Sequence, residues 1–170
     1  MIRRGERHNV TMPPTVNIRI AHIISGAQTG ADRAALDWAI AHGLPHGGWC
    51  PAGRRAEDGV IPDIYQMRET PSRAYESRTK CNVRDSDATL IISKNPELSG
   101  GSKRTREFAI ALGKPCLHLH AGLDSAAALR DFLASNPVTV LNIAGPREST
   151  EPGIGSFVLT TLDTCRDSFA

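Results

Sequence analysis

A strand, a glycine turn and a helix follow one another early in the chain, and this succession constrains the fold most. Residues 18–24 form a short run rich in β-branched side chains, which is typical of a buried parallel strand. The small-residue turn Gly26–Gly30 follows, and apolar side chains then recur at helical spacing from Ala31 to Ala39 before Gly43. Together the three segments predict the first half of a βαβ unit.

The same alternation continues along the chain. Further strands are expected at residues 46–51 (a strand or its exit loop), 65–68, 88–93, 115–120 and 139–144, and helices at 71–83, 102–112, 125–134 and 153–162. Pro71 is the expected first residue of its helix, and residues 52–63 read as a long polar loop. This order predicts an α/β fold: a Rossmann-like three-layer sandwich with a mostly parallel sheet of about six strands and helices on both faces. The ligand crevice of such a sheet lies beyond the carboxyl ends of the strands.

Composition narrows the class of protein. The chain has 170 residues, 40% of them hydrophobic and 22% charged, and lacks an apolar run of the ~18 residues that a membrane helix needs. We expect a soluble protein with one domain over residues 18–170, preceded by a disordered tail at residues 1–17. That tail is basic but has no apolar segment, which favours the cytoplasm over secretion. The four scattered cysteines read as reduced thiols, and the net charge of +2 gives no indication of a nucleic-acid partner.

The first glycine turn is a candidate phosphate site. Glycines let backbone N–H groups approach a ligand, and the following helix presents its positive end to an anion. Gln28 and Thr29 add side-chain donors. The turn lacks the third spaced glycine of the dinucleotide fingerprint and the Lys-Ser/Thr pair of a P-loop. We interpret it as a binding turn rather than a packing turn, with these candidate residues: Gly26, Ala27, Gln28, Thr29 and Gly30.

A second junction of this design follows the strand at 88–93. Its candidate residues are Ser99, Gly100, Gly101, Ser102 and Lys103. Lys103, Arg104 and Arg106 occupy the first turn of the next helix, where cations oppose the helix dipole unless a bound anion reverses the balance. Glu107 is either a neutralising partner for these cations or a catalytic acid.

The block at residues 46–58 supplies a third group of candidates. Gly47 and Gly48 allow close approach, Trp49 offers a stacking surface, and Arg54 and Arg55 are planar donors suited to phosphate. Cys50 is a potential soft ligand. The alternative, a solvated loop with one buried Trp, is equally compatible with the sequence.

Two other clusters have a structural interpretation. Arg84, Asp85 and Asp87 are expected to form helix-end caps and ion pairs. Cys116, His118 and His120 alternate along one strand and share a face, which could bind a metal, but the intervening leucines favour a packed strand. We therefore expect no metal site.

Several motifs in register resemble the putative molybdenum carrier family, relatives of the molybdenum cofactor carrier proteins within the Rossmann-like lonely-guy and DprA-type group. They are SGAQTGADRAALDWA, HGGWCPAGRRAEDG, NVRDSD and LSGG, followed by LNIAGPRESTEPGIG at residues 141–155. The likeness spans residues 20–162. Ala27 and the Lys103-Arg104 pair depart from the family pattern.

The resemblance implies a parallel-sheet fold, a homo-oligomer, and binding of molybdenum cofactor (molybdopterin) or molybdate as cargo without turnover. The expected ligand is thus a phosphorylated pterin or nucleotide-like molecule, with molybdoenzymes or cofactor-synthesis proteins as potential partners. A first alternative is a nucleotide N-glycosidase of the lonely-guy type, a phosphoribohydrolase in which Glu107 would act as the carboxylate. A second alternative is a nucleotide-sensing or single-strand-sensing module, which the small number of aromatic residues disfavours.

Overall fold

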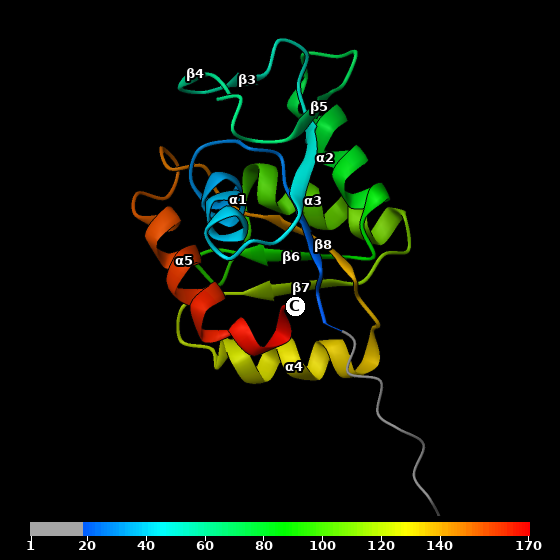
Figure 1. Ribbon diagram of the computed structural model, residues 1–170, viewed down its shortest axis with the longest axis vertical. Coiled ribbons are helices and arrows are strands. Elements are labelled where there is room, and N and C mark those ends of the chain that lie inside the picture. The colour runs from blue at the N-terminus through cyan, green and yellow to red at the C-terminus, as the bar shows by residue number, and fades with distance from the viewer. Residues whose placement is uncertain (1–18) are drawn as a thin grey trace, which may run out of the picture.

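A computed structural model of the chain describes residues 19–170, so the predicted tail at residues 1–17 lies outside them (Figure 1). The strands are β1 (His22–Ile24), β2 (His46–Cys50), β3 (Arg55–Ala56), β4 (Gly59–Val60), β5 (Met67–Glu69), β6 (Ala88–Ile92), β7 (Cys116–Leu119) and β8 (Val140–Ala144). The helices are α1 (Ala31–Ala41), α2 (Tyr75–Asp85), α3 (Gly100–Ala111), α4 (Ser125–Ser135) and α5 (Ile154–Thr164), and a 3-10 turn, η1, covers Arg166–Ser168.

Six strands form one parallel sheet in the order β5-β2-β1-β8-β6-β7. The chain builds outward from β1 through β2 to β5, crosses to β6 and β7 on the other side, and returns so that β8 fills the gap between β1 and β6. Helices α1, α4 and α5 pack on one face, and α2 and α3 pack together on the other. The predicted Rossmann-like three-layer α/β fold is confirmed.

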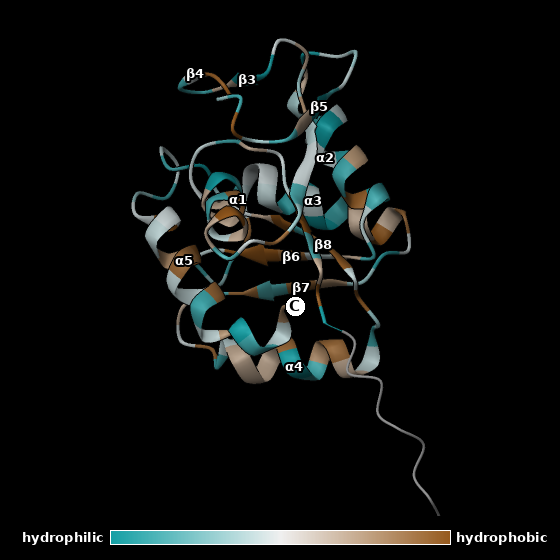
Figure 2. Ribbon diagram, in the orientation of Figure 1, coloured by the Kyte–Doolittle hydropathy of each residue, from teal (hydrophilic) through white to brown (hydrophobic). Residues whose placement is uncertain are grey.

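The hydrophobic core lies between these layers. Every residue of β6 is buried, as expected for a parallel strand inside the sheet, and β6 is mostly brown, and so mostly apolar, in Figure 2. Helix α1 contributes its buried alanines and Trp38, whose Nε1 donates to Asp163 at 2.7 Å. The first strand begins at His22, later than predicted, because the chain at Ile20 pairs instead with the C-terminal Phe169.

Residues 52–63, predicted as a polar loop, contain the β3–β4 hairpin. The hairpin covers a second apolar cluster that includes Leu36 of α1, Cys50 and Ile61. Tyr65 closes this cluster, and its hydroxyl donates to Asp37 at 2.6 Å. Glu57 and Asp58 connect the two strands, and Gly59, at φ 118°, follows them directly; a glycine at this position after polar residues is the turn signal that would have indicated the hairpin.

Helix α2 begins at Tyr75, not at Pro71 as predicted. The Thr70 hydroxyl donates to the Ser72 carbonyl at 2.8 Å, and the same carbonyl accepts the Ala52 N–H at 2.9 Å. These bonds hold the segment before α2 against the end of β2. The Ser72 carbonyl is therefore committed outside the helix.

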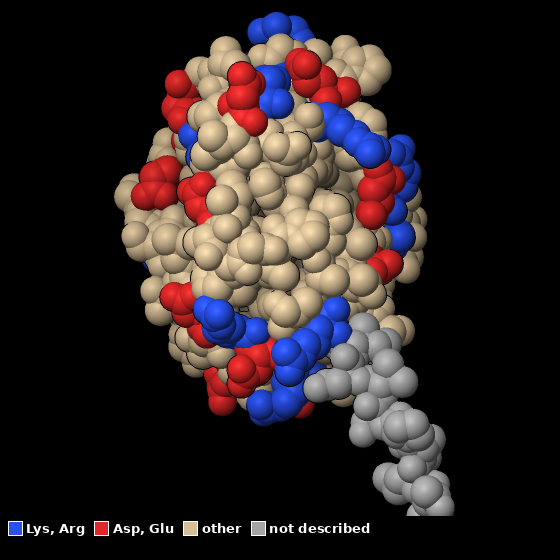
Figure 3. Space-filling view, viewed as in Figure 1, with Lys and Arg blue, Asp and Glu red and all other residues tan. Residues whose placement is uncertain are grey.

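None of the helices within residues 19–170 has the length and apolar character needed to cross a membrane. All four cysteines are free. On the face seen in Figure 3, Lys and Arg side chains lie beside Asp and Glu around the rim, and the central area carries no charge.

Candidate functional site

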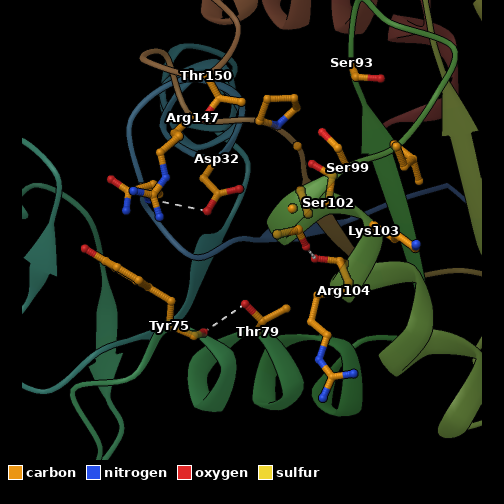
Figure 4. Close-up of a pocket in the computed structure, with 18 of the residues that line it drawn as sticks. Asp32, Tyr75, Thr79, Ser93, Ser99, Ser102, Lys103, Arg104, Arg147 and Thr150 are labelled. Atoms are coloured by element: carbon orange, nitrogen blue, oxygen red, sulfur yellow. Dashed lines mark hydrogen bonds between the residues drawn. The ribbon is translucent and has the colours of Figure 1, made fainter.

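A cavity of about 520 Å³ lies beyond the carboxyl ends of β1, β6 and β8, where the chain changes direction across the sheet. Gln28 follows β1, Ser93 follows β6, and Gly145 follows β8. The first turns of α2 and α3 complete the wall (Figure 4). Ligands bind at this point in open parallel sheets, because neighbouring loops diverge there.

The N-terminus of α3 opens into the cavity. The first N–H groups of a helix have no intrahelical acceptor, and the Ser99 side chain does not cap them. A Cβ added at Gly101 would meet nothing within 4 Å, so the space above this turn is open. Lys103 lies on the same turn, and within residues 19–170 no carboxylate forms a salt bridge with it. The helix dipole and the Lys103 ammonium therefore both favour an anion here.

A buried ion pair forms another part of the wall. Arg78 Nη1 lies 3.1 Å from Asp32 Oδ2, and the two side chains are only 12% and 4% exposed. Burial raises the pKa of Asp32, and the Arg78 guanidinium opposes that rise. Gly26 makes room for the pair, since a Cβ there would lie 1.7 Å from Arg78 Nη1.

Gln28 contacts this pair through its main-chain N–H, which donates to Asp32 Oδ2 at 3.4 Å, and its side-chain oxygen is held by two hydrogen bonds. Its Oε1 accepts the Glu57 N–H at 2.9 Å and the Thr29 N–H at 3.1 Å. Its Nε2 is buried and has no acceptor among the described residues. Gln28 lines the cavity, but its Nε2 has almost no exposed surface there.

Tyr75 and Arg147 also line the cavity, although neither was predicted as a site residue from the sequence. The Tyr75 ring has the guanidinium carbons of Arg55, Arg147 and Arg78 at 4.7, 5.1 and 5.9 Å from its centroid. Figure 4 shows Tyr75 and Arg147 on the side of the cavity away from α3. No local signal in the sequence joins Arg55 and Arg147 to Tyr75, because they lie in β3 and in the loop after β8, whereas Arg78 shares α2 with Tyr75.

Glu107, the alternative catalytic acid, has a charge partner. Arg104 binds it at 2.9 Å and also binds Glu76 of α2 at 3.2 Å, which ties the two helices together at the cavity. The arginine also lies over the Phe108 ring, at 4.6 Å from the centroid. This geometry favours the neutralising role for Glu107.

The cavity brings together several of the predicted binding residues, namely Gln28, Ser99, Gly100, Gly101, Ser102 and Lys103. The other residues of the first glycine turn make internal contacts. Ala27 is buried at φ 57°, and the Thr29 hydroxyl donates to Glu57. A Cβ at Gly30 would lie 2.5 Å from the Glu148 nitrogen, and the Ala31 N–H donates to the Pro146 carbonyl at 3.0 Å.

The block at residues 46–58 lies mainly outside the cavity wall. Gly47 and Gly48 belong to β2, and a Cβ at Gly48 would lie 2.2 Å from the Ser25 carbonyl oxygen. Trp49 Nε1 donates to Asp85 at 2.7 Å. Arg54 Nη2 donates to the Pro62 carbonyl at 2.8 Å, so this side chain stabilises the hairpin, whereas Arg55 reaches Tyr75.

His118 of β7 contacts Ser93, which lines the cavity. His118 Nε2 lies 2.6 Å from Ser93 Oγ, and the His118 and His120 rings are 5.3 Å apart. Burial lowers the pKa of His118. Residues 19–170 contain no group of three or more His, Cys, Asp or Glu side chains arranged to hold a metal ion.

Fold and cavity together define a Rossmann-like α/β protein whose site lies where the sheet changes direction, with one open helix N-terminus. The chain belongs to the circularly permutated YpsA SLOG family, whose model matches residues 23–166. The crystal structure of a putative molybdenum carrier protein from Syntrophus aciditrophicus SB is 48% identical in sequence, with a TM-score of 0.82 over 86% of this chain and 95% of that one.

Another solved structure, that of (E)-4-hydroxy-3-methyl-but-2-enyl diphosphate reductase, aligns at 12% identity over 85% of this chain and 59% of that chain, with a TM-score of 0.38. This similarity is too low to support an argument. No curated protein sequence matches the chain significantly.

Proposed function

We propose that the protein binds a phosphate-bearing pterin, the molybdenum cofactor, as cargo in the cavity at the carboxyl ends of the strands, and carries it without chemical change. The observation that carries the proposal is the open N-terminus of α3 with Lys103 on the same turn. The similarity to a protein named as a molybdenum carrier supports the choice of cargo.

The phosphate would bind at α3. A terminal phosphate accepts several hydrogen bonds at once, and the N–H groups of the first turn of a helix converge in the way that it requires. Gly100 and Gly101 let the phosphate approach the backbone, because neither has a side chain to cover it. The Lys103 ammonium would add a charge-assisted bond.

The rest of the cargo would extend toward Gln28 and Arg78. The cavity volume of about 520 Å³ falls within the range of ≈ 300–1,000 Å³ that is usual for small-molecule sites. Its wall includes the polar side chains of Gln28, Thr79 and Arg147, and a polar bicyclic ring has several donors and acceptors that can match such groups. The residues therefore fit a phosphorylated pterin.

The ion pair between Arg104 and Glu107 supports a carrier over a hydrolase. Arg104 binds the Glu107 carboxylate at 2.9 Å and also binds Glu76, so Glu107 takes part in a contact between α3 and α2.

The test compares two aspartate variants on α3. Gly101→Asp places a carboxylate where the phosphate would bind, whereas Ile110→Asp makes the same change of charge on the same helix at a side chain that is 71% exposed. Titration calorimetry with molybdenum cofactor should give binding that Ile110→Asp keeps and Gly101→Asp loses. Cleavage of AMP by the wild type that disappears in Glu107→Ala, without cofactor binding, would establish the glycosidase instead.

A further inference from the structure

Three guanidinium groups surround the Tyr75 ring at the cavity wall. Those of Arg55, Arg147 and Arg78 lie 4.7, 5.1 and 5.9 Å from the ring centroid. They come from β3, from the loop after β8 and from α2, so the fold brings them to one ring from three segments. Like charges that gather in this way repel one another, unless an aromatic face, carboxylates or a bound anion offsets the repulsion.

Carboxylates offset only part of this charge. Asp32 pairs with Arg78 at 3.1 Å, and Glu57 lies 3.7 Å from Arg147 Nη1. Within residues 19–170, Arg55 has no salt bridge. The three guanidinium groups thus have two carboxylates paired with them, and an excess of positive charge remains beside Tyr75.

Arg147 is the member of this group whose donors remain available to a ligand. Its side chain is 38% exposed, and the residue lines the cavity. The distance of 3.7 Å to Glu57 is too long for a hydrogen bond, and the Glu57 carboxylate already accepts the Thr29 and Ser149 hydroxyls. Among the hydrogen bonds that arginine side chains donate within residues 19–170, none comes from Arg147.

The Tyr75 ring positions the Arg147 guanidinium without using its N–H groups. A cation–π contact depends on the charge of the guanidinium and the face of the ring, so the planar set of N–H donors stays free. The other two arginines are committed differently. Arg78 is only 12% exposed and bound to Asp32, and Arg55, which does not line the cavity, donates to the Arg73 carbonyl at 3.0 Å.

This group is separate from the phosphate site proposed at α3. Figure 4 shows Tyr75 and Arg147 on the side of the cavity away from Lys103. A ligand with its phosphate at α3 would therefore meet Arg147 with another of its groups. A guanidinium with free N–H groups binds oxyanions through two parallel hydrogen bonds, so this second group should be anionic.

We propose that Arg147, held against Tyr75 and with the charge of Arg55 behind the ring, forms a second anion subsite of the cavity. The proposal rests on the proposed function and specifies its ligand, which carries an anionic group in addition to its phosphate. In molybdenum cofactor this group is the oxo-metal centre with its two sulfur ligands. A pterin with a phosphate alone would leave the subsite unused.

The experiment compares molybdenum cofactor with 6-hydroxymethylpterin monophosphate, which keeps the pterin and a phosphate but lacks the second anionic group. Titration calorimetry should show that Arg147→Gln weakens cofactor binding by about tenfold or more, the usual effect of a lost charge-assisted hydrogen bond. Its affinity for the pterin monophosphate should stay within about twofold of the wild-type value. Gly101→Asp should weaken binding of both ligands.

Arg130→Gln is the matched control. It removes the same charge from an exposed side chain on α4, across the sheet from α2 and α3, and should leave both affinities unchanged. Near-ultraviolet circular dichroism checks that Arg147→Gln keeps the native fold. If it does not, Arg147→Lys takes its place with the same selective loss, because lysine lacks the planar pair of donors.

Two results would overturn the proposal: unchanged cofactor affinity in the Arg147 variant, or an equal loss for both ligands, which would assign Arg147 to the shape of its loop. The proposed function would survive either result if the wild type bound the cofactor and Gly101→Asp abolished that binding. Failure of the wild type to bind the cofactor would overturn both proposals.

Discussion

Arg78 belongs to an ion pair, with Asp32, in which both side chains are buried. Removing one partner of a buried ion pair leaves an uncompensated charge in a poorly solvated place. Arg78→Met should therefore lower the free energy of unfolding by about 3 kcal/mol, measured by urea denaturation. Arg84→Met is the matched control, because Arg84 pairs with Asp85 at a 55% exposed side chain and should lose less than about 1 kcal/mol.

A second substitution, made in the Arg78→Met variant, tests whether the unpaired charge of Asp32 causes this loss of stability. Asp32→Asn removes the charge that Arg78→Met leaves behind, so the double variant should be more stable than the sum of the two single effects predicts. Strict additivity would show that the ion pair contributes no coupling energy. Similar losses for Arg78→Met and Arg84→Met would contradict the importance of burial.

Replacement of two glycines by alanine should have different effects on the stability of the protein. Gly26→Ala places a Cβ 1.7 Å from Arg78 Nη1 and displaces the guanidinium from Asp32, so it should destabilise the protein. Gly101→Ala meets nothing within 4 Å and should leave stability unchanged or raise it by up to about 1 kcal/mol, because alanine favours a helix more than glycine does. Thermal denaturation of the two variants gives the comparison, and a loss at Gly101 alone would contradict it.

At the scale of elements, the contact between the β3–β4 hairpin and the loop after β8 depends on one carboxylate. Hydrogen bonds from Ser149 and Thr29 lower the pKa of Glu57 from its usual 4.5. For a carboxyl group with a lowered pKa in the folded state, the stabilisation is complete above the unfolded value and is lost as the pH falls through the folded one. Acidification below 4.5 should therefore release this contact.

The variant Glu57→Gln tests this dependence. It should flatten the fall in unfolding free energy below pH 4.5 and lower stability at neutral pH, as measured by urea denaturation at a series of pH values. Asp63→Asn is the control, because that side chain is fully exposed and should leave the acid slope as it is in the wild type. An unchanged slope in Glu57→Gln would show that the hairpin contact does not depend on this charge.

The elements that were predicted best from the sequence are those with a clear local pattern of residues. Strand β6 is buried at every residue, and helix α3 begins with a Gly-Gly pair, so both could be recognised locally. The start of α2 was misplaced, because a proline is compatible with a helix start but does not enforce one. Long-range bonds, such as the one from the Ala52 N–H to the Ser72 carbonyl, decided that boundary.

Some residues of the candidate site could also be predicted from the sequence, and others could not. The α3 turn could be predicted because its glycines and cations are contiguous in the sequence. Asp32, Tyr75, Arg78 and Arg147 could not, because the sheet topology brings them together from three separate regions. Gln28 was predicted as a donor from its turn, but its fixed orientation depends on the Glu57 main chain, which only the folded hairpin supplies.

For the whole molecule, binding of the cargo should increase the stability of the folded protein. A ligand that binds only the folded state at a concentration 100 times its Kd contributes about 2.7 kcal/mol. For a chain of this size, that corresponds to a rise in Tm of roughly 5–10 °C. Molybdenum cofactor should produce this shift with wild type and Ile110→Asp, and not with Gly101→Asp. A shift that all three proteins share would place the ligand elsewhere.

The most direct measurement is a crystal structure of the protein with molybdenum cofactor, with anomalous data collected at the molybdenum edge to identify the ligand. We predict that the phosphate lies within hydrogen-bond distance of the N–H groups in the first turn of α3. Cofactor bound at another surface, or bound in this cavity with its phosphate away from α3, would contradict the account.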